Sequence, residues 1–357
     1  MDLDAAFWRG RHVLLTGHTG FKGAWAALWL QRLGAQISGF ALEPDTTPSL
    51  YEAAHVKGEV RGTIGDIRDR DALRTACAAT VPEIVMHMAA QPLVRAGYED
   101  PLRTYSTNVA GTGNVIDAAR AIDSVRAIVV LTSDKCYDLR GPDVPHAETD
   151  ALGGAEPYSA SKASAEFVVA GMRPMVRAQR DGAIGLASAR AGNVIGGGDW
   201  SRDRLIPDLM VSLHAHRSPS IRNPDAVRPW QHVLDALAGY FALAQRLYEA
   251  PAAYSQPWNF GPDAADALPV RTIADTVCAL AGDETSWTHD ASDEHPREAD
   301  ALRLDSRKAA AQLGWSARLH VRDALAWTAD WYKQFYAGAD ARTLVERDIE
   351  RYEALPA

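Results

Sequence analysis

Short buried-strand patterns alternate with helical patterns in the first half of the chain, and this alternation constrains the fold more than any other feature. Short apolar runs bounded by glycine or polar residues are typical of buried strands, and apolar residues at every third or fourth position are typical of amphipathic helices. We expect strands at residues 12–16, 36–41, 83–87, 127–132 and 184–190, and helices at residues 21–33, 101–122 and 158–178. Strands that alternate with helices form a parallel sheet covered on both faces. The sequence therefore predicts an α/β fold built on a doubly wound parallel sheet.

The second half of the chain changes in texture after about residue 190. Prolines and tryptophans become frequent, elements become shorter, and the run Gly196-Gly197-Gly198 predicts a flexible break. Helical patterns return at residues 233–250 and 320–336. One domain rarely exceeds about 250 residues, and this chain has 357. We therefore expect a first lobe over residues 1–190 and a smaller, mixed α/β lobe over 191–357, with part of 232–262 packing back onto the first.

The composition is that of a folded globular protein. Hydrophobic residues make up 47% and charged residues 23% of the chain, which excludes disorder, collagen and coiled coil. No apolar run approaches the roughly 18 residues of a membrane span, and the acidic N-terminal residues do not resemble a secretory signal. The net charge of −9 argues against a nucleic-acid partner. Three scattered cysteines without ligand or disulfide spacing predict no metal site and fit a reducing cytoplasm.

Glycines recur with the spacing G-x-x-G-x-x-G directly after the first expected strand and at the start of the first helix. Glycine lets the backbone turn tightly and approach a diphosphate, and a helix N-terminus offers free N–H groups and a positive dipole to that anion. The alternative is a glycine-rich turn without a ligand, but the position in a β/α series favours dinucleotide binding. The residues expected to contact the dinucleotide here are Gly17, Thr19, Gly20, Phe21, Lys22 and Gly23.

The residues after the second and third expected strands bear on which dinucleotide binds. An acid at the end of the second strand normally binds the ribose hydroxyls of NAD. Ala41 occupies that position, Glu43 lies two residues later and can substitute, and no arginine is present to bind the extra phosphate of NADP. These residues favour NAD. Asp66 and Ile67 follow the third strand; they are expected to reach the adenine, although a turn aspartate is nearly as good an interpretation of Asp66.

Tyr158 is the one tyrosine that has a lysine, Lys162, four residues later. Residues four apart lie on the same face of a helix. A lysine cation beside a phenol favours the phenolate, and we expect it to lower the pKa of the tyrosine towards the working pH. Such a pair could move a proton on and off a sugar hydroxyl. A surface Tyr–Lys pair is the alternative, and the preceding glycine motif favours catalysis.

A polar run, Ser133-Asp134-Lys135, follows the expected strand at 127–132. Ligands of open parallel sheets bind at the carboxyl ends of the strands, so these side chains are expected to face cofactor and substrate. Serine and aspartate also favour simple turns, which is the alternative. An acid beside a lysine at a strand end is harder to explain by a turn alone.

With these motifs in this order, the chain resembles the extended short-chain dehydrogenase/reductase family, which comprises NAD-dependent epimerases and dehydratases with a Rossmann-type fold. Within the family it is similar to the nucleotide-sugar 4,6-dehydratases, and most to those that act on CDP-glucose. The strings that carry the resemblance are GHTGFKG, HMAAQPLVR, TSDKCYD, RAGNVIGGGDW, DRLIP and RPWQHV. The resemblance implies NAD as the cofactor, further cofactor contacts at Ala89, Ala90, Asn108, Tyr158 and Lys162, and a role in making the deoxysugars of bacterial surface polysaccharides.

The resemblance also implies a reaction sequence. Tyr158, aided by Lys162 and Ser133, removes the proton of the 4-hydroxyl while a hydride passes to NAD. Asp134 matches the family's acid for loss of water across carbons 5 and 6, and the hydride then returns to carbon 6. Lys135 stands where the wider dehydratase pattern has glutamate. A lysine acts as a base only if its pKa falls well below the free value of about 10.4, so the alternative is that Lys135 only positions Asp134 or water.

The resemblance implies that residues of the second lobe bind the substrate. Asn193, Arg204 and Arg228 match positions that contact the nucleotide diphosphate, a task that suits the planar fork of arginine. Arg228 could instead be a structural cation packed on Trp230. The family usually forms a homodimer through the helices expected at 101–122 and 158–178.

Two rival functions fit parts of this sequence. A 4-epimerase or reductase on the same fold needs the glycines, the tyrosine and the lysine, but not the Asp134-Lys135 pair. A silent NAD-binding sensor would be expected to lack Tyr158 or Lys162, and both are present. The sequence identifies no particular residue as the one that recognises the cytosine base.

Overall fold

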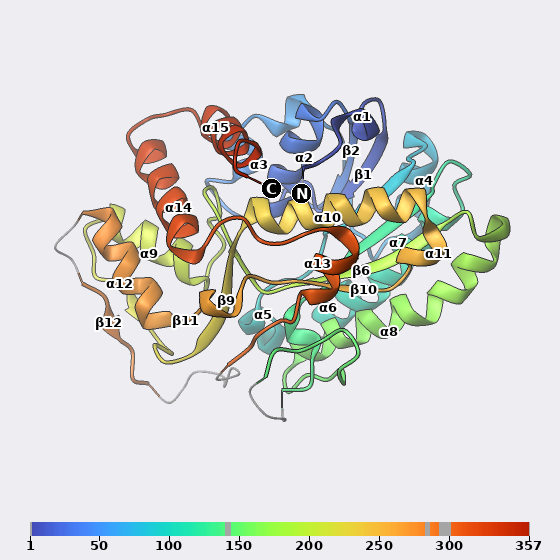
Figure 1. Cartoon of the computed structure of the whole chain (residues 1–357). Coiled ribbons are helices and arrows are strands. Elements are labelled where there is room, and N and C mark those ends of the chain that lie inside the picture. Colours follow the sequence, from blue (N-terminus) through green and yellow to red (C-terminus); the bar gives the residue numbers. More distant parts are fainter. Residues whose placement is uncertain (1, 140–143, 283–285, 293–300, 357) are drawn as a thin grey trace.

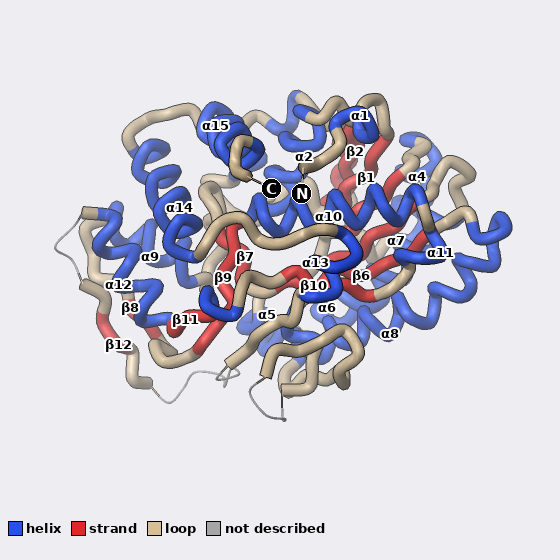
Figure 2. Tube along the Cα trace, viewed as in Figure 1, coloured by secondary structure: helices blue, strands red, loops and turns tan. Residues whose placement is uncertain are grey.

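A seven-stranded parallel sheet forms the centre of the computed structural model, which describes residues 2–139, 144–282, 286–292 and 301–356 (Figure 2). Its strand order is β3-β2-β1-β4-β5-β6-β10. The strands are β1 (His12–Thr16), β2 (Gln36–Ala41), β3 (Arg61–Ile64), β4 (Ile84–His87), β5 (Ala127–Leu131), β6 (Gly185–Ala191) and β10 (Pro257–Phe260). The order reverses between β1 and β4, and such a reversal opens a crevice at the carboxyl ends of the strands. The predicted α/β fold is confirmed.

Helices cover both faces of the sheet because successive side chains of each strand point to opposite sides. Val13 and Leu15 of β1 pack into the layer that contains α2 and α10, whereas Leu14 packs into the layer that contains α4, α7 and α8. These helices are α2 (Phe21–Arg32), α4 (Arg70–Thr80), α7 (Thr112–Arg120), α8 (Pro157–Ala178) and α10 (Val233–Glu249). Shorter helices connect the layers: α1 (Ala5–Trp8), α3 (Leu50–Ala53), α5 (Val94–Glu99), α6 (Pro101–Tyr105), α11 (Pro251–Tyr254) and α13 (Arg307–Leu313).

The helix expected at 101–122 is divided by one wide segment. Between α6 and α7, residues Ser106–Gly111 form a π-helix. π-segments are rare and are found mostly at functional sites. Asn108 lies in this segment, and its amide is hydrogen-bonded to two other elements of the fold. The apolar spacing of the sequence predicted a helix over these residues. The hydrogen bonds of Asn108 to Gln91 and Ser161 are made where the α-helix widens to a π-helix.

The second lobe is built on two small sheets. β7 (Asn193–Ile195) pairs with β9 (Val227–His232), which pairs with β11 (Ala267–Pro269), and β8 (Ser220–Ile221) pairs with β12 (Thr288–His289). The helices of this lobe are α9 (Leu205–His214), α12 (Val270–Ala281) and α14 (Val321–Tyr336). Strand β7 begins two residues after β6 ends, so the second lobe starts at the carboxyl edge of the large sheet.

Segments from the second half of the chain also build the first lobe. β10 is an edge strand of the large sheet, α10 covers one face of it, and α15 (Ala341–Glu353) packs against α2, so the two termini lie near each other (Figure 1). The Trp29 indole N–H donates to Glu353 at 2.9 Å. We therefore propose the division at residue 190 with α10, β10 and α15 assigned to the first lobe.

The glycine run at 196–198 is a packed segment and not the flexible break that the sequence suggested. All three glycines are buried. A Cβ atom on Gly197 would lie 2.1 Å from the Trp331 ring, and Gly198 has a φ of +81°. Gly197 is required because α14 approaches the backbone closely there, which the local sequence does not reveal. Within the described part of the chain, no helix has the length and apolar composition needed to cross a membrane.

Candidate active site

A cavity of about 1370 Å³ lies where the carboxyl ends of the large sheet meet the second lobe. Asn108, one of the residues expected at the site, does not line this cavity. The others all line it: Gly17, Thr19, Gly20, Phe21, Lys22, Gly23, Asp66, Ile67, Ala89, Ala90, Ser133, Asp134, Lys135, Tyr158, Lys162, Asn193, Arg204 and Arg228. Tertiary structure thus brings residues from both lobes to one space.

The glycine loop is shaped to receive a diphosphate. Gly17 has a φ of +78°, and a Cβ atom there would lie 2.7 Å from the Ala89 nitrogen; a Cβ on Gly23 would lie 2.1 Å from the Gly17 oxygen. Helix α2 begins directly after Gly20, which provides no side-chain cap. The first-turn amides of a helix have no carbonyl partner within it, so those of α2 remain available to an anion. This loop fits the diphosphate of a dinucleotide.

The rim of the cavity beside β2 and β3 contains Glu43 and Asp66, the two acidic residues that the sequence suggested for binding NAD. The Thr19 hydroxyl donates to the Leu42 carbonyl at 2.8 Å, which ties the glycine loop to the end of β2. Glu43 lines the cavity two residues after β2 ends. Asp66 also lines it, but its carboxylate accepts from the Arg68 amide and guanidinium, and Arg68 holds the pKa of Asp66 below its usual value. Asp66 is therefore a turn aspartate that also faces the cavity.

Asn108 lies behind the cavity wall and joins two of its elements. Its Oδ1 accepts from the Gln91 amide at 2.8 Å, and its Nδ2 donates to the Gln91 carbonyl at 3.0 Å and to the Ser161 hydroxyl at 2.8 Å. Ser161 is on α8 between Tyr158 and Lys162. Asn108 thus positions the loop after β4 relative to α8 and, in this structure, makes no direct contact with the cavity.

Tyr158 and Lys162 lie on the face of α8 that borders the cavity. The Glu156 carboxylate caps the helix by accepting from the amides of Tyr158 and Ser159. Ser133 acts to lower the pKa of the Tyr158 hydroxyl, and the Lys162 ammonium donates to the Leu131 carbonyl at 3.5 Å. Pairing of the two residues on one helix face follows from their spacing.

The lowered pKa that the sequence predicted for Tyr158 is wrong for this structure. Burial raises the pKa of Tyr158 to about 12, while the Ser133 hydrogen bond and the Arg204 charge act in the opposite direction. Burial also lowers the pKa of Lys162 to about 8. Both shifts have one cause, which is the cost of charge in a low-dielectric interior. Local spacing could not predict this because burial depends on the packing of α8 against other elements.

Asp134 and Lys135 form a short 3₁₀ turn directly after the end of β5. Oδ1 of Asp134 accepts from the Ser133 hydroxyl at 2.9 Å and from the Lys135 amide at 2.8 Å. Oδ2 of Asp134 is buried without a hydrogen-bond partner among the described residues, and Gly192 leaves the space beside it open. Burial raises the pKa of Asp134, although the charge of Lys135 opposes this effect. Such a carboxyl is suited to carry a proton at Oδ2.

Cations gather on the side of the cavity formed by the second lobe. Arg228 is buried on β9, Arg204 precedes α9, and Asn193 begins β7. Burial and the charges of Arg204 and Lys162 lower the pKa of Lys22 to about 8. The mutual repulsion of these cations would be relieved by an anion between them.

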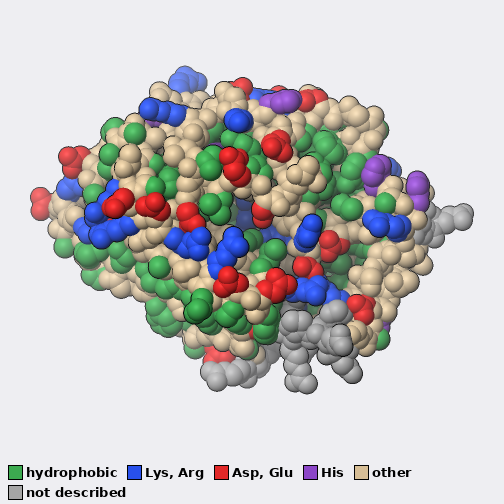
Figure 3. All heavy atoms as spheres, turned by 180° about the vertical axis from the view of Figure 1, so that it is seen from behind, with side chains coloured by type: hydrophobic (Ala, Val, Ile, Leu, Met, Phe, Trp, Pro, Cys, Tyr) green, Lys and Arg blue, Asp and Glu red, His purple; other side chains and the backbone are tan. Residues whose placement is uncertain are grey.

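Sequence reasoning missed an ion-pair group at the cavity mouth. Arg95 of α5 pairs with Asp203 at 2.8 Å, and Arg222 lies 3.5 Å from the same carboxylate. The group connects the first lobe to the second, and Figure 3 shows charged side chains of both signs around a hollow on this side of the molecule. Arg95 ends the string HMAAQPLVR and could have been considered from it, whereas no local pattern pointed to Arg222 or Asp203.

Among the described residues, no cluster of histidine, cysteine or acidic side chains could hold a metal ion.

The parallel sheet and the residues at its carboxyl edge define the extended short-chain dehydrogenase/reductase class. Two solved structures share the fold. The UDP-glucose 4-epimerase of Thermus thermophilus in complex with NAD has a TM-score of 0.77 and 21% identity, covering 92% of this chain and 99% of that one. The UDP-glucose 4-epimerase of Brucella ovis in complex with NAD has a TM-score of 0.75 and 23% identity, covering 90% and 98%.

A more particular relationship comes from the sequence. The family model described as GDP-mannose 4,6 dehydratase matches residues 14–328. The CDP-glucose 4,6-dehydratase of Salmonella typhimurium (strain LT2) is 46% identical over 354 residues, which covers 98% of each protein. This chain belongs to the GDP-mannose 4,6-dehydratase family, and the resemblance inferred from the motifs is confirmed.

Proposed function

We propose that this protein is an NAD-dependent lyase that converts CDP-glucose to CDP-4-keto-6-deoxyglucose and water in the cytoplasm. The observation that carries the proposal is the buried Oδ2 of Asp134, which has no hydrogen-bond partner among the described residues and lies in the same cavity wall as Ser133 and Tyr158. A 4-epimerase or reductase has no use for a second acid at this place. The identity to a CDP-glucose 4,6-dehydratase over nearly the whole chain supports the choice of nucleotide.

The binding of the two ligands follows from the charges along the cavity. The amides that begin α2 would hold the NAD diphosphate, and Glu43 would bind the ribose hydroxyls at the rim. Asn193, Arg204 and Arg228 would hold the diphosphate of the nucleotide sugar, and Lys22, which also lines the cavity, would add positive charge near these anions. This arrangement brings the sugar close to Tyr158. NAD, when bound, accepts a hydride from carbon 4 and later returns it to carbon 6.

The first chemical step falls to Tyr158. Its oxygen, in the phenolate form, takes the proton of the 4-hydroxyl, and the Ser133 hydroxyl, which acts to lower the pKa of Tyr158, can donate to that oxygen. The Lys162 cation, one helical turn away, stabilises the phenolate electrostatically. Because burial raises the pKa of Tyr158 to about 12, the site has to supply positive charge when the ligands are in place.

The second step falls to Asp134 and Lys135. The keto group at carbon 4 acidifies the hydrogen on carbon 5, and Lys135 removes it as a proton when its side chain is in the neutral amine form. Asp134 protonates the departing 6-hydroxyl from Oδ2, so that water leaves. The raised pKa of Asp134 favours the protonated form that this role requires.

The internal return of hydride provides the direct test of this function. With CDP-glucose deuterated at carbon 4, the deuterium is expected on carbon 6 of the product, as measured by NMR or mass spectrometry. Release of labelled NADH in proportion to product would contradict the proposal and indicate a plain dehydrogenase. Return of the label to carbon 4 with inversion would indicate a 4-epimerase. A parallel panel of dTDP-glucose, UDP-glucose and GDP-mannose tests the preference for CDP.

We also propose that the protein forms a homodimer through α6 and α8, which contact each other. Leu102 of α6 is 79% exposed and Phe167 of α8 is 63% exposed. Met175, two helical turns beyond Phe167, is exposed on the same face, and Gly171 between them has open space around it. Large exposed apolar side chains that gather on one face mark interaction sites, and the open glycine lets a second helix approach.

Phe167→Asp is expected to convert the dimer to a monomer, because it places a charge at the centre of this face. Size-exclusion chromatography with light scattering measures the mass. Val211→Asp, on the exposed face of α9, makes the same chemical change elsewhere and should leave the mass unchanged. A monomeric wild type, or a dimeric Phe167→Asp variant, would contradict the proposed interface.

A further inference from the structure

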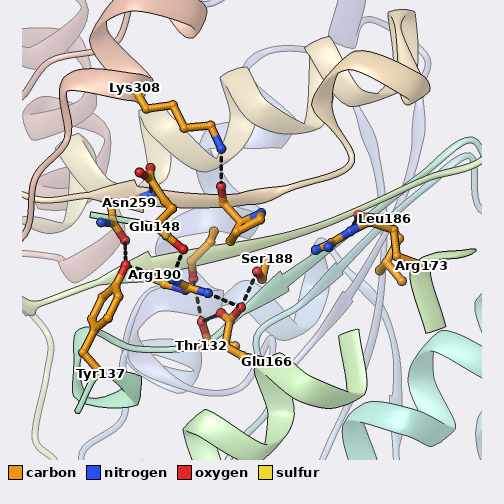
Figure 4. Close-up of polar contacts among 12 residues, drawn as sticks. Thr132, Tyr137, Glu148, Glu166, Arg173, Leu186, Ser188, Arg190, Asn259 and Lys308 are labelled. Atoms are coloured by element: carbon orange, nitrogen blue, oxygen red, sulfur yellow. Dashed lines mark hydrogen bonds and ion pairs between the residues drawn. The ribbon is translucent and has the colours of Figure 1, made fainter. Parts of the chain in front are cut away.

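A buried ion pair lies behind the catalytic loop and outside the cavity. Glu166 of α8 and Arg190 of β6 are 2.8 Å apart, and both side chains are 3% exposed. Neither residue lines the cavity. Figure 4 shows that they connect a network of polar side chains from several elements. The site described above uses none of these contacts.

The carboxylate of Glu166 holds the segment that leads into the catalytic loop. It accepts a hydrogen bond from the Thr132 hydroxyl, which precedes Ser133, and one from the Ser188 hydroxyl at 2.7 Å. Glu166 also lies one helical turn beyond Lys162 on α8. One side chain thus links the start of the loop to the helix that carries Tyr158 and Lys162.

The guanidinium of Arg190 holds the segment that leaves the catalytic loop. It donates to the Tyr137 hydroxyl at 2.8 Å and lies over the Tyr137 ring, 5.0 Å from the ring centroid. The Tyr137 hydroxyl in turn donates to Asn259 of β10 at 2.7 Å. Residues 132 and 137 are therefore both anchored by the same ion pair, one on each side of residues 133–136.

Burial of two charges is costly, and a buried ion pair is weak evidence for stability. Burial acts to raise the pKa of Glu166, but the hydrogen bond and charge of Arg190 outweigh it and hold the pKa below its usual value. Glu166 therefore stays ionised and accepts hydrogen bonds without donating any. An ionised acceptor imposes one geometry on the hydroxyl and guanidinium donors around it.

We propose that the Glu166–Arg190 pair is a positioning clamp that sets Asp134 and Lys135 relative to Tyr158 and Lys162. This inference rests on the proposed function, since it divides the reaction between two groups of residues. Tyr158 and Lys162 sit on α8 and perform the oxidation at carbon 4. Asp134 and Lys135 sit on the clamped loop and perform the loss of water. A loosened clamp should therefore harm the second step more than the first.

The test uses Glu166→Gln and Arg190→Met in the full-length protein with NAD and CDP-glucose. A misplacement of about 1 Å can cost on the order of 10²-fold in rate. We expect loss of water and exchange of the carbon 5 hydrogen with heavy water to fall at least about tenfold relative to oxidation, so that enzyme-bound NADH accumulates. The double variant should be no worse than the worse single variant, because either change releases the same clamp.

Asp235→Asn is the matched control. Asp235 is a buried carboxylate on α10 that accepts from the Arg318 amide and the Tyr352 hydroxyl, outside the cavity. It should lower thermal stability without changing the ratio of the two steps. If the ion-pair variants behave in the same way, with a lower melting temperature and a wild-type ratio, the pair is only structural and the inference is overturned.

Two milder variants keep the test valid if the ion-pair variants do not fold. Thr132→Val removes only the hydroxyl that donates to Glu166, and Tyr137→Phe removes only the hydroxyl that Arg190 contacts. Each should shift the ratio in the same direction by a smaller factor, and an unchanged ratio in both would overturn the inference. A wild type that forms no 4-keto-6-deoxy product would instead refute the proposed function, so the two failures are distinguishable.

Discussion

Tyr158→Phe should lower turnover by roughly 10²-fold to 10⁴-fold, the range typical of a positioned proton carrier. The ring and its packing are kept, while the oxygen that carries the proton in the cavity is lost. Affinity for NAD should change little, because the glycine loop and the start of α2 are separate from this oxygen. Steady-state kinetics and a cofactor-binding titration measure the two effects.

Tyr352→Phe is the control for this substitution. Tyr352 is a buried tyrosine on α15 that does not line the cavity, and its hydroxyl donates to Asp235. The same loss of a buried hydroxyl there should leave turnover near that of the wild type. Wild-type turnover in Tyr158→Phe would remove Tyr158 from the mechanism.

Lys135→Met should block loss of water while oxidation at carbon 4 survives. The substitution keeps the length of the side chain and removes the amine at the turn that follows β5. Tyr158 and Lys162 still perform the first step, so bound NADH should accumulate after substrate is added. Exchange of the carbon 5 hydrogen with heavy water should nearly stop, with a rate loss of orders of magnitude. Absorbance of NADH and mass spectrometry of the recovered sugar measure both.

Lys135→Glu gives the sharper comparison. It places at residue 135 the carboxylate that the resemblance implies for the wider dehydratase pattern. Partial recovery of exchange over Lys135→Met would support a base at this position. Persistent exchange in Lys135→Met would assign the base to another group and leave Lys135 the role of positioning Asp134, whose carboxylate accepts from its amide.

Particular residues show how far sequence reasoning reached. The expected strands at 12–16 and 36–41 coincide with β1 and β2, because a buried strand consists largely of consecutive apolar residues, which are visible in the sequence. The glycine loop was predicted from spacing, and the structure adds that Gly17 has to accommodate Ala89. The run at 196–198 was misinterpreted, since Gly197 leaves room for a tryptophan on a helix more than a hundred residues later, and Gly196 and Gly198 face other distant side chains.

Local periodicity was enough to predict the alternation of strands and helices, the glycine turn at the first helix, and the placement of Tyr158 and Lys162 on one face of a helix. Only the tertiary structure decided the raised pKa of Tyr158, the buried Glu166–Arg190 pair and the Arg95–Asp203 bridge at the cavity mouth. Local patterns specify which way a side chain faces within its own element. Burial, charge pairing and desolvation depend on which distant elements pack together, and therefore arise only when the whole chain has folded.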